Sequence, residues 1–258
     1  MSSTGAIEVS AAFCIPLRVE LTRQQAFGYL VGGSDTTATT LAWFCKYIGD
    51  HPRVQSKLRA ALRQTHADAA AERRNPNVLE ITKTSVPYLD AVVEETLRLA
   101  GTAAITGRDA IVDTTVLGHP IPKGTLVLFM IKGPGTALPR ITGGLDESRR
   151  SASSKPTTGN WDPEEIELYQ PERWIVANAE TGEEEFDPSA GPMMAFGGGP
   201  RGCFGRRLAY LELRIAVTML LWNFEFLKVS DELNSYEALD RITTLPKMAN
   251  IKLRRAQW

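Results

Sequence analysis

The sequence predicts a mainly helical fold with small antiparallel β-sheets, which places it in the α+β class. Apolar residues recur at helical spacing in four stretches, at 22–49, 52–66, 86–100 and 204–222. The spacing changes to two between residues 109 and 131, as expected for strands. The chain has 258 residues, of which 43% are hydrophobic and 23% charged, and this composition is typical of a globular domain.

The first helix is predicted over 22–49. Thr22 and Gln25 fit a capping box at its start. Its centre holds Gly32 and Gly33, and two adjacent glycines cost about 2 kcal/mol of helix propensity relative to alanine. A helix with this weakness needs a packing or functional reason to keep both glycines.

Two further helices are predicted in the first half of the chain. Pro52 fits the first position of a helix that runs to about His66. The polar stretch 67–76 that follows is predicted to be a loop or a frayed helix end. The next helix begins after Ser85, and Gly101 ends it.

The second half of the chain is predicted to mix strands, loops and one long helix. Residues 109–117 and 125–131 are predicted to pair as a small antiparallel sheet. Residues 132–161 are rich in glycine, serine, proline and charge, which predicts a long loop. The helix 204–222 follows, and two or three short strands complete the chain. Residues 1–21 remain unassigned, and 22–258 are predicted to form one domain.

Charge and composition exclude several classes of protein. The net charge is −1, so we expect no nucleic-acid partner. The three cysteines, Cys14, Cys45 and Cys203, lie far apart, so a disulfide scaffold is not expected. The histidines form no HExxH pattern, which excludes a zinc-protease site.

No segment of the sequence has the pattern of a membrane span. The most apolar helical stretch, 211–222, is short and is interrupted by Glu212 and Arg214. The N-terminus has no basic region followed by an apolar one, so no signal peptide is expected.

A glycine-rich segment at 196–205 carries the strongest chemical signal. It fits the pattern F-x-x-G-x-R-x-C-x-G at every fixed position, with Cys203 just before a predicted helix. The start of a helix favours a thiolate, because free N–H groups and the helix dipole stabilise negative charge there. A lone cysteine is more often a buried structural residue, and the surrounding pattern reverses that preference.

This pattern resembles the C-terminal half of a cytochrome P-450, a haem-thiolate monooxygenase. The resemblance implies that Cys203 is the iron ligand of haem b and that Arg201 pairs with a haem propionate. Phe196, Gly197, Gly199 and Gly205 would belong to the same cofactor-binding loop, since glycine lets the backbone approach a flat macrocycle.

The double glycine of the first helix begins a second motif of the same family. Gly33, Asp35 and Thr36 fit [A/G]-G-x-[D/E]-T. By resemblance, Gly33 makes room above the iron, Thr36 hydrogen-bonds the oxygen, and Asp35 passes protons inward from water. The alternative is structural, with the hydroxyl bonded to the carbonyl four residues earlier in a bent helix.

Two further matches concern arginines. Glu95 and Arg98 fit the family's E-x-x-R on one helical face, and Arg173 of a Pro-Glu-Arg segment would complete a buried cluster. Its implied role is to orient the cysteine loop. Arg108, by its position after this helix, resembles the family's second propionate-binding arginine.

The resemblance implies a monooxygenase that takes electrons from an NADPH-dependent reductase and oxidises a small organic substrate. Trp161 and the polar residues before it resemble filamentous-fungal members of biosynthetic pathways, which suggests secondary metabolism. Full-length relatives are expected on the cytoplasmic side of the endoplasmic reticulum membrane. The family's N-terminal half, with its membrane anchor, is expected to be absent from this chain.

Two alternatives to this activity remain open. The first is a truncated, non-catalytic relative with weak or no haem binding, which would act as an interaction protein or be a fragment. The second is a haem-thiolate isomerase or dehydratase that needs no oxygen, although retention of Thr36 and Asp35 argues against it. The residues after Arg98, from Leu99 to Thr102, depart from the family pattern and leave the shape of the pocket open.

Overall fold

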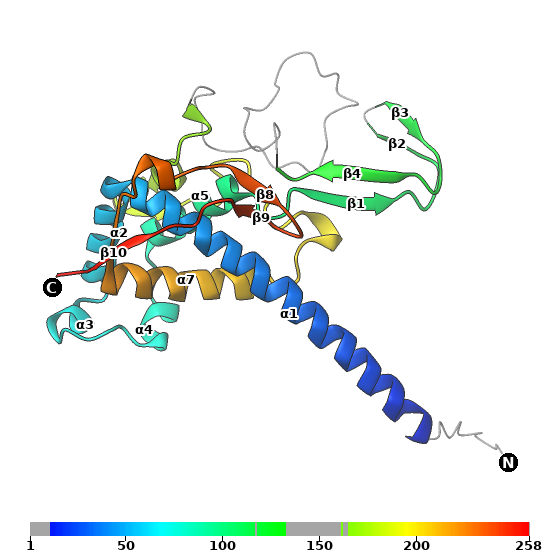
Figure 1. Ribbon diagram of the computed structural model, residues 1–258, viewed down its shortest axis with the longest axis horizontal. Coiled ribbons are helices and arrows are strands. Elements are labelled where there is room, and N and C mark those ends of the chain that lie inside the picture. Colours follow the sequence, from blue (N-terminus) through cyan, green and yellow to red (C-terminus); the bar gives the residue numbers. More distant parts are fainter. Residues whose placement is uncertain (1–10, 117, 133–160, 162–164, 258) are drawn as a thin grey trace.

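The structure of the chain is a computed structural model that describes residues 11–116, 118–132, 161 and 165–257, with side chains described from residue 22 onward. One long helix, α1, crosses the molecule diagonally, and its N-terminal half extends away from the other helices (Figure 1). Strands β1 to β4 project from the body on the side away from α2, α3 and α4. The predicted α+β class, with small antiparallel sheets, is confirmed.

Helix α1 spans Ala11–Asp50 without interruption. It therefore begins earlier than the predicted 22–49 and includes part of the unassigned segment. Residues 22–31 of this helix are exposed, whereas Trp43, Phe44 and Ile48 near its other end are buried. Among the described side chains of α1, those in the C-terminal half are thus the ones anchored in the core.

Three more of the predicted helices are confirmed, and they supply the rest of the core. They are α2 (Pro52–Thr65), α5 (Pro87–Ala100) and α7 (Arg206–Asn223). Gly101 caps the end of α5 with a left-handed φ of 51°, as its position predicted. The largest buried apolar cluster joins these helices to α1 through residues such as Phe44, Leu58, Leu89, Val92, Leu213 and Leu221. Among the described residues, no helix is long and apolar enough to cross a membrane.

The stretch after α2 contains more structure than predicted. Residues 67–76 include the short helix α3 (Ala67–Ala71), and α4 (Val78–Lys83) comes next. Asn77 and Glu80 form a capping box at the start of α4, each accepting from the other's backbone N–H. The prediction of a loop over 67–76 was wrong where α3 forms, and the box that starts α4 was overlooked.

The first sheet differs from the prediction in its boundaries. Strand β1 (Ile105–Asp109) pairs antiparallel with β4 (Leu126–Met130), and β2 (Thr114–Val116) pairs with β3 (His119–Ile121). The predicted strand 109–117 is therefore wrong, because the chain turns between β1 and β2. Asp113 accepts the backbone N–H of Lys123 at 2.7 Å, and this side-chain bond competes with ladder pairing.

The remaining elements are short and flank the helices. The hairpin of β5 (Ile175–Ala177) and β6 (Glu184–Phe186) follows the 3₁₀ helix η3 (Pro171–Trp174). After α7, β7 (Phe224–Leu227) pairs with β10 (Lys252–Arg255), and β8 (Ala238–Asp240) pairs with β9 (Thr244–Pro246). The described chain thus has four strands there, against the two or three predicted. The predicted loop 132–161 lies outside the described residues except at its two ends.

Candidate functional site

A large cavity lies between α1, the β1–β4 sheet, the start of α7 and residues 196–205, which we call the cysteine loop. Its volume is about 1280 Å³. Pockets for drug-sized ligands usually measure about 300–1,000 Å³. The cavity therefore has room for a group larger than a typical small substrate.

The cysteine loop is held by its own backbone hydrogen bonds. The N–H of Cys203 donates to the carbonyl of Phe196 at 2.8 Å, and the N–H of Gly202 donates to Gly199 at 3.0 Å. Gly197 and Gly199 both have φ of 65°, a left-handed conformation that favours glycine. The glycines at these two positions let the loop double back toward α7.

Cys203 lies in the cavity wall, three residues before α7 begins at Arg206. Its side chain is exposed, so its sulfur is open to a group that lies in the cavity. Cys45, by contrast, is half-buried, and burial raises the pKa of its thiol to about 11. Cys45 is thus a poor nucleophile and ligand, and it packs against the core as a small apolar residue.

Arg108, on β1, and Arg201, in the cysteine loop, both line the cavity. Arg108 donates to Thr106 Oγ1 at 2.9 Å and to the carbonyl of Gly107 at 2.7 Å. Within the described part of the chain, neither guanidinium pairs with a carboxylate. Two cations on the wall of one cavity suit a ligand that carries carboxylates.

The glycines on the walls leave open space where a cofactor would lie. A Cβ placed on Gly33 of α1, or on Gly197 or Gly198 of the cysteine loop, would meet no atom within 4 Å. The cavity walls carry one thiol, several glycines and two guanidiniums that have no carboxylate partner among the described residues. This set of groups fits haem b, which is flat, largely apolar and has two propionates. No group of three or more His, Cys, Asp or Glu side chains that could hold a metal ion occurs among the described residues.

The structure separates the two predicted oxygen-side residues. Thr36 lines the cavity, but its hydroxyl donates to the carbonyl of Gly32 at 2.8 Å, which is the structural alternative considered above. The oxygen of this hydroxyl can still accept a hydrogen bond. Asp35 is exposed, lies outside the cavity wall and accepts from the hydroxyl of Thr243 at 2.7 Å.

The carboxyl group that does line the cavity is that of Glu212, on α7. Thr37 of α1 donates to its Oε2 at 3.1 Å, so this contact joins the oxygen-side helix to the helix after the cysteine loop. In the sequence, Glu212 stands out only as a charge that interrupts an apolar helix. That interruption was the available signal, because charged side chains are rarely buried without a partner.

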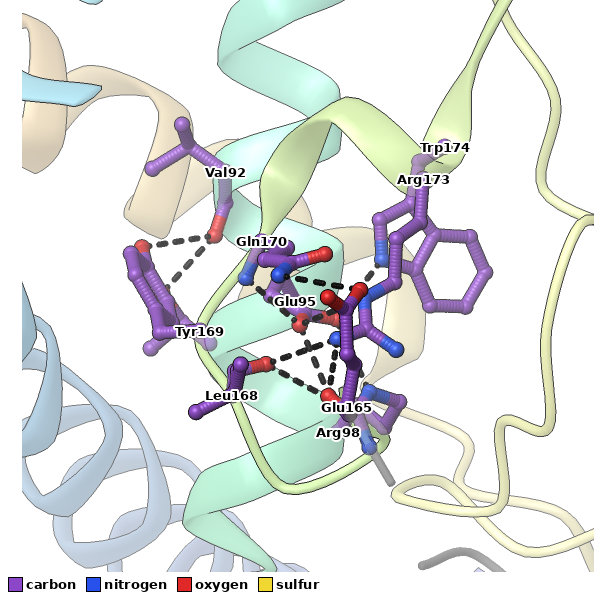
Figure 2. Close-up of polar contacts among 10 residues, drawn as sticks. Val92, Glu95, Arg98, Glu165, Leu168, Tyr169, Gln170, Arg173 and Trp174 are labelled. Carbon is purple, nitrogen blue, oxygen red and sulfur yellow. Dashed lines mark hydrogen bonds and ion pairs between the residues drawn. The ribbon is translucent and has the colours of Figure 1, made fainter. Parts of the chain in front are cut away.

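The predicted cluster of Glu95, Arg98 and Arg173 is confirmed (Figure 2). Arg98 donates to both oxygens of Glu95 at 2.8 Å, and the Nε of Arg173 lies 3.8 Å from Glu95 Oε1. The indole N–H of Trp174 and the backbone N–H of Gln170 also donate to Glu95, at 2.9 and 3.0 Å. These last two partners were missed, since they depend on how η3 docks against α5.

Comparison with known proteins agrees with this geometry. The sequence profile of the cytochrome P-450 family matches residues 16–135 and 162–253. The cytochrome P-450 monooxygenase TRI13 of Fusarium sporotrichioides is 42% identical over 244 residues, which are 89% of this chain and 41% of that protein. The cytochrome P-450 monooxygenase xilC of Penicillium rubens is 44% identical over 214 residues, covering 83% of this chain and 36% of that protein.

A third relative is shorter. The Hps1-dma1 cluster cytochrome P-450 monooxygenase cyp3.1 of Dothistroma septosporum is 38% identical over 244 residues, covering 90% of this chain and 77% of that protein. The chain thus spans about two fifths of the length of the first two relatives and about three quarters of the third. All three are fungal and are named monooxygenases, that is, oxidoreductases. With the profile matching most of its length, the chain belongs to the cytochrome P-450 family.

Proposed function

We propose that this chain forms the cysteine-side and oxygen-side walls of a haem-thiolate monooxygenase that inserts one atom of dioxygen into a small organic substrate. One observation carries the proposal: Cys203 of the cysteine loop and Thr36 of α1 line the same cavity. The gene cluster named for one fungal relative supports a role in secondary metabolism, and membership of the family supports an NADPH-dependent reductase as electron donor.

The residues that would hold haem b are on three walls of the cavity. Cys203 would ligate the iron, Arg108 and Arg201 would pair with the propionates, and Gly33 would leave room on the oxygen side. Haem b with a thiolate ligand supplies the redox chemistry that cleaves dioxygen.

The chain itself would contribute the handling of protons. Thr36 can accept a hydrogen bond at its Oγ1 while it donates to Gly32. Glu212, which accepts from Thr37, offers a carboxyl group on the cavity wall, and Asp35 offers one at the exposed surface of α1. We propose that Thr36 accepts a hydrogen bond in the cavity and that Glu212 and Asp35 supply protons from the cavity wall and from the surface of α1, since a positioned acid or hydroxyl accelerates proton transfer.

The test of the cofactor site is the reduced carbon monoxide spectrum of the chain after loading with haem b. Cys203→Ser should abolish the thiolate-type band, because serine is a poor ligand for haem iron. Cys45→Ser is the matched control and should keep the band, because Cys45 lies outside the cavity wall. Survival of the band in Cys203→Ser would overturn the assignment, and a complete failure to bind haem would favour the non-catalytic alternative.

The test of the oxygen side is Thr36→Ala in the haem-loaded protein supplied with a reductase. The rate of the productive step should fall by about 10²–10⁴-fold, the usual contribution of one acid–base group. Product formed per dioxygen consumed should therefore fall, while haem content stays the same. Thr40→Ala is the control, since Thr40 also lines the cavity and also donates to a carbonyl four residues earlier. If coupling is equal in the two variants, the Thr36 hydroxyl only bonds to the Gly32 carbonyl of its own helix.

A further inference from the structure

One buried carboxyl group near the cysteine loop has no part in the function proposed above. Glu94 on α5 is 1% exposed and lies next to Glu95 in the chain. Its Oε2 accepts from the hydroxyl of Tyr210, on α7, whereas its Oε1 has no hydrogen-bond partner among the described residues. A buried carboxyl with one unsatisfied oxygen is costly, so its retention calls for a reason.

The partner of Glu94 belongs to a small aromatic group behind the cysteine loop. The ring of Tyr210 lies 5.2 Å from the ring of Phe196, measured between centroids. The guanidinium of Arg206 lies 5.6 Å from the Phe196 ring and 5.5 Å from the Tyr210 ring. Such ring and cation contacts fix the relative positions of the side chains that make them.

Phe196 connects this group to the proposed iron ligand. Its carbonyl accepts the backbone N–H of Cys203 at 2.8 Å, which sets where Cys203 lies in the loop. A continuous series of contacts thus runs from the Glu94 carboxyl through Tyr210 and Phe196 to Cys203. We propose that Glu94 is a positioning residue for Cys203 that acts through Tyr210 and Phe196, an inference that rests on the proposed role of Cys203.

The charges around Glu94 agree with this role. Burial raises the pKa of the Glu94 carboxyl to about 7, against the hydrogen bond from Tyr210 and the positive charge of Arg206 on α7, which lower it. Asp90, one turn earlier on α5, raises it further. Burial of the Glu94 carboxyl costs free energy, and its hydrogen bond with Tyr210 offsets part of that cost.

The experiment measures the alkylation of Cys203 by iodoacetamide in the chain without haem, followed by peptide mass spectrometry to separate it from the other cysteines. Glu94→Ala and Tyr210→Phe should each lower the rate constant at Cys203 by about 3- to 10-fold, the equivalent of one buried hydrogen bond. The rate falls because a cysteine displaced from its present place on the open cavity wall is less accessible to the reagent. The double variant should be no slower than the slower single variant, because both changes break the same connection.

Two control variants separate positioning from general loosening. Glu94→Gln keeps an acceptor oxygen for Tyr210 and should stay within about twofold of the unaltered chain. Asp90→Asn weakens a different α5–α7 contact, the 2.6 Å pair with Arg214, and should also leave the rate within about twofold. Unchanged rates in Tyr210→Phe, or an equal loss in Asp90→Asn, would overturn the proposal, and Tyr210→Phe decides it alone if Glu94→Ala does not fold.

A second measurement uses the haem-loaded protein. Glu94→Ala and Tyr210→Phe should shift part of the reduced carbon monoxide spectrum from the thiolate-type band to the band of protein without thiolate ligation, and Asp90→Asn should not. If Cys203→Ser shows that Cys203 is not the iron ligand, the proposed function fails. The alkylation rates still decide whether Glu94 positions Cys203.

Discussion

The region around Glu95 and the region around Cys203 differ in how far the chain itself bonds their polar side chains. Around Glu95, four donors occupy the two carboxylate oxygens, and the side chains of Glu95 and Arg98 are 0% and 1% exposed. Around Cys203, the loop is held by backbone hydrogen bonds and the thiol is exposed. The first region satisfies both oxygens of its central carboxylate within the chain, whereas the second presents its thiol to a cavity.

Glycines in the two regions show the same difference. A Cβ on Gly191, beside the Glu95 cluster, would lie 2.0 Å from ring atoms of Trp161, so this region is tightly packed. A Cβ on Gly197 or Gly198 would meet nothing within 4 Å. We infer that changes near Glu95 affect mainly folding, and that changes at the cavity affect mainly the cofactor.

The largest expected effect comes from Glu95→Gln. This change leaves Arg98 buried without a counter-charge, and breaking one partner of a buried pair costs about 3–5 kcal/mol. Urea unfolding of the chain measures the free energy of unfolding. Glu225→Gln is the control, because it breaks an exposed pair with Arg254, worth about 0–1 kcal/mol. Equal losses in the two variants would mean that the Glu95 cluster contributes no more to stability than an exposed ion pair.

A smaller effect is expected from the pH dependence of Glu94. Burial raises the pKa of its carboxyl from 4.5 to about 7 in the folded chain, so the unfolded chain releases this proton at lower pH than the folded one. The contribution of the Glu94 carboxyl to the free energy of unfolding is therefore present in full below pH 4.5. It is lost as the pH rises through 7, which lowers the free energy of unfolding by about 3 kcal/mol.

Glu94→Gln removes this loss. The free energy of unfolding of the unaltered chain, relative to that of Glu94→Gln, should fall by about 2–3 kcal/mol between pH 4.5 and pH 8. Other carboxyl groups cancel in this difference. If the free energies of unfolding of the two chains change with pH in parallel, burial does not raise the pKa of the Glu94 carboxyl. The region around Cys203 would then have no buried carboxyl group that is costly to ionise.

The sequence predicted local features better than contacts between distant segments. The helix limits at Pro52 and Gly101 follow from proline and glycine stereochemistry, and the cysteine loop from its spacing. The partners of Glu95 at Gln170 and Trp174 lie more than 70 residues away, so no local pattern contains them. For the same reason the Glu94–Tyr210 bond could not be predicted.

Thr36 shows the limit of reading a motif residue by residue. The pattern places Thr36 on the cavity wall, and the structure agrees. Its neighbour Asp35, one position earlier on the helix, points instead to Thr243, because successive helical residues differ by about 100° in direction. Glu212 of α7 supplies the carboxyl at the wall, and only the packing of α7 against α1 brings it there.

The smallest expected effect has the opposite sign and comes from Gly33→Ala. Alanine in the interior of α1 should stabilise the chain by about 1 kcal/mol, because it removes the backbone entropy cost of glycine and its Cβ meets no atom within 4 Å. The same methyl group stands on the cavity wall, so haem b affinity should fall at least about fivefold, the equivalent of about 1 kcal/mol of overpacking. Urea unfolding and an absorbance titration with haem measure the two quantities.

Ser34→Ala, an exposed position outside the wall, should stabilise the helix slightly and leave haem affinity unchanged. Equal haem affinities in the two variants would place the cofactor away from Gly33, and the glycine pair would then need an explanation in packing alone.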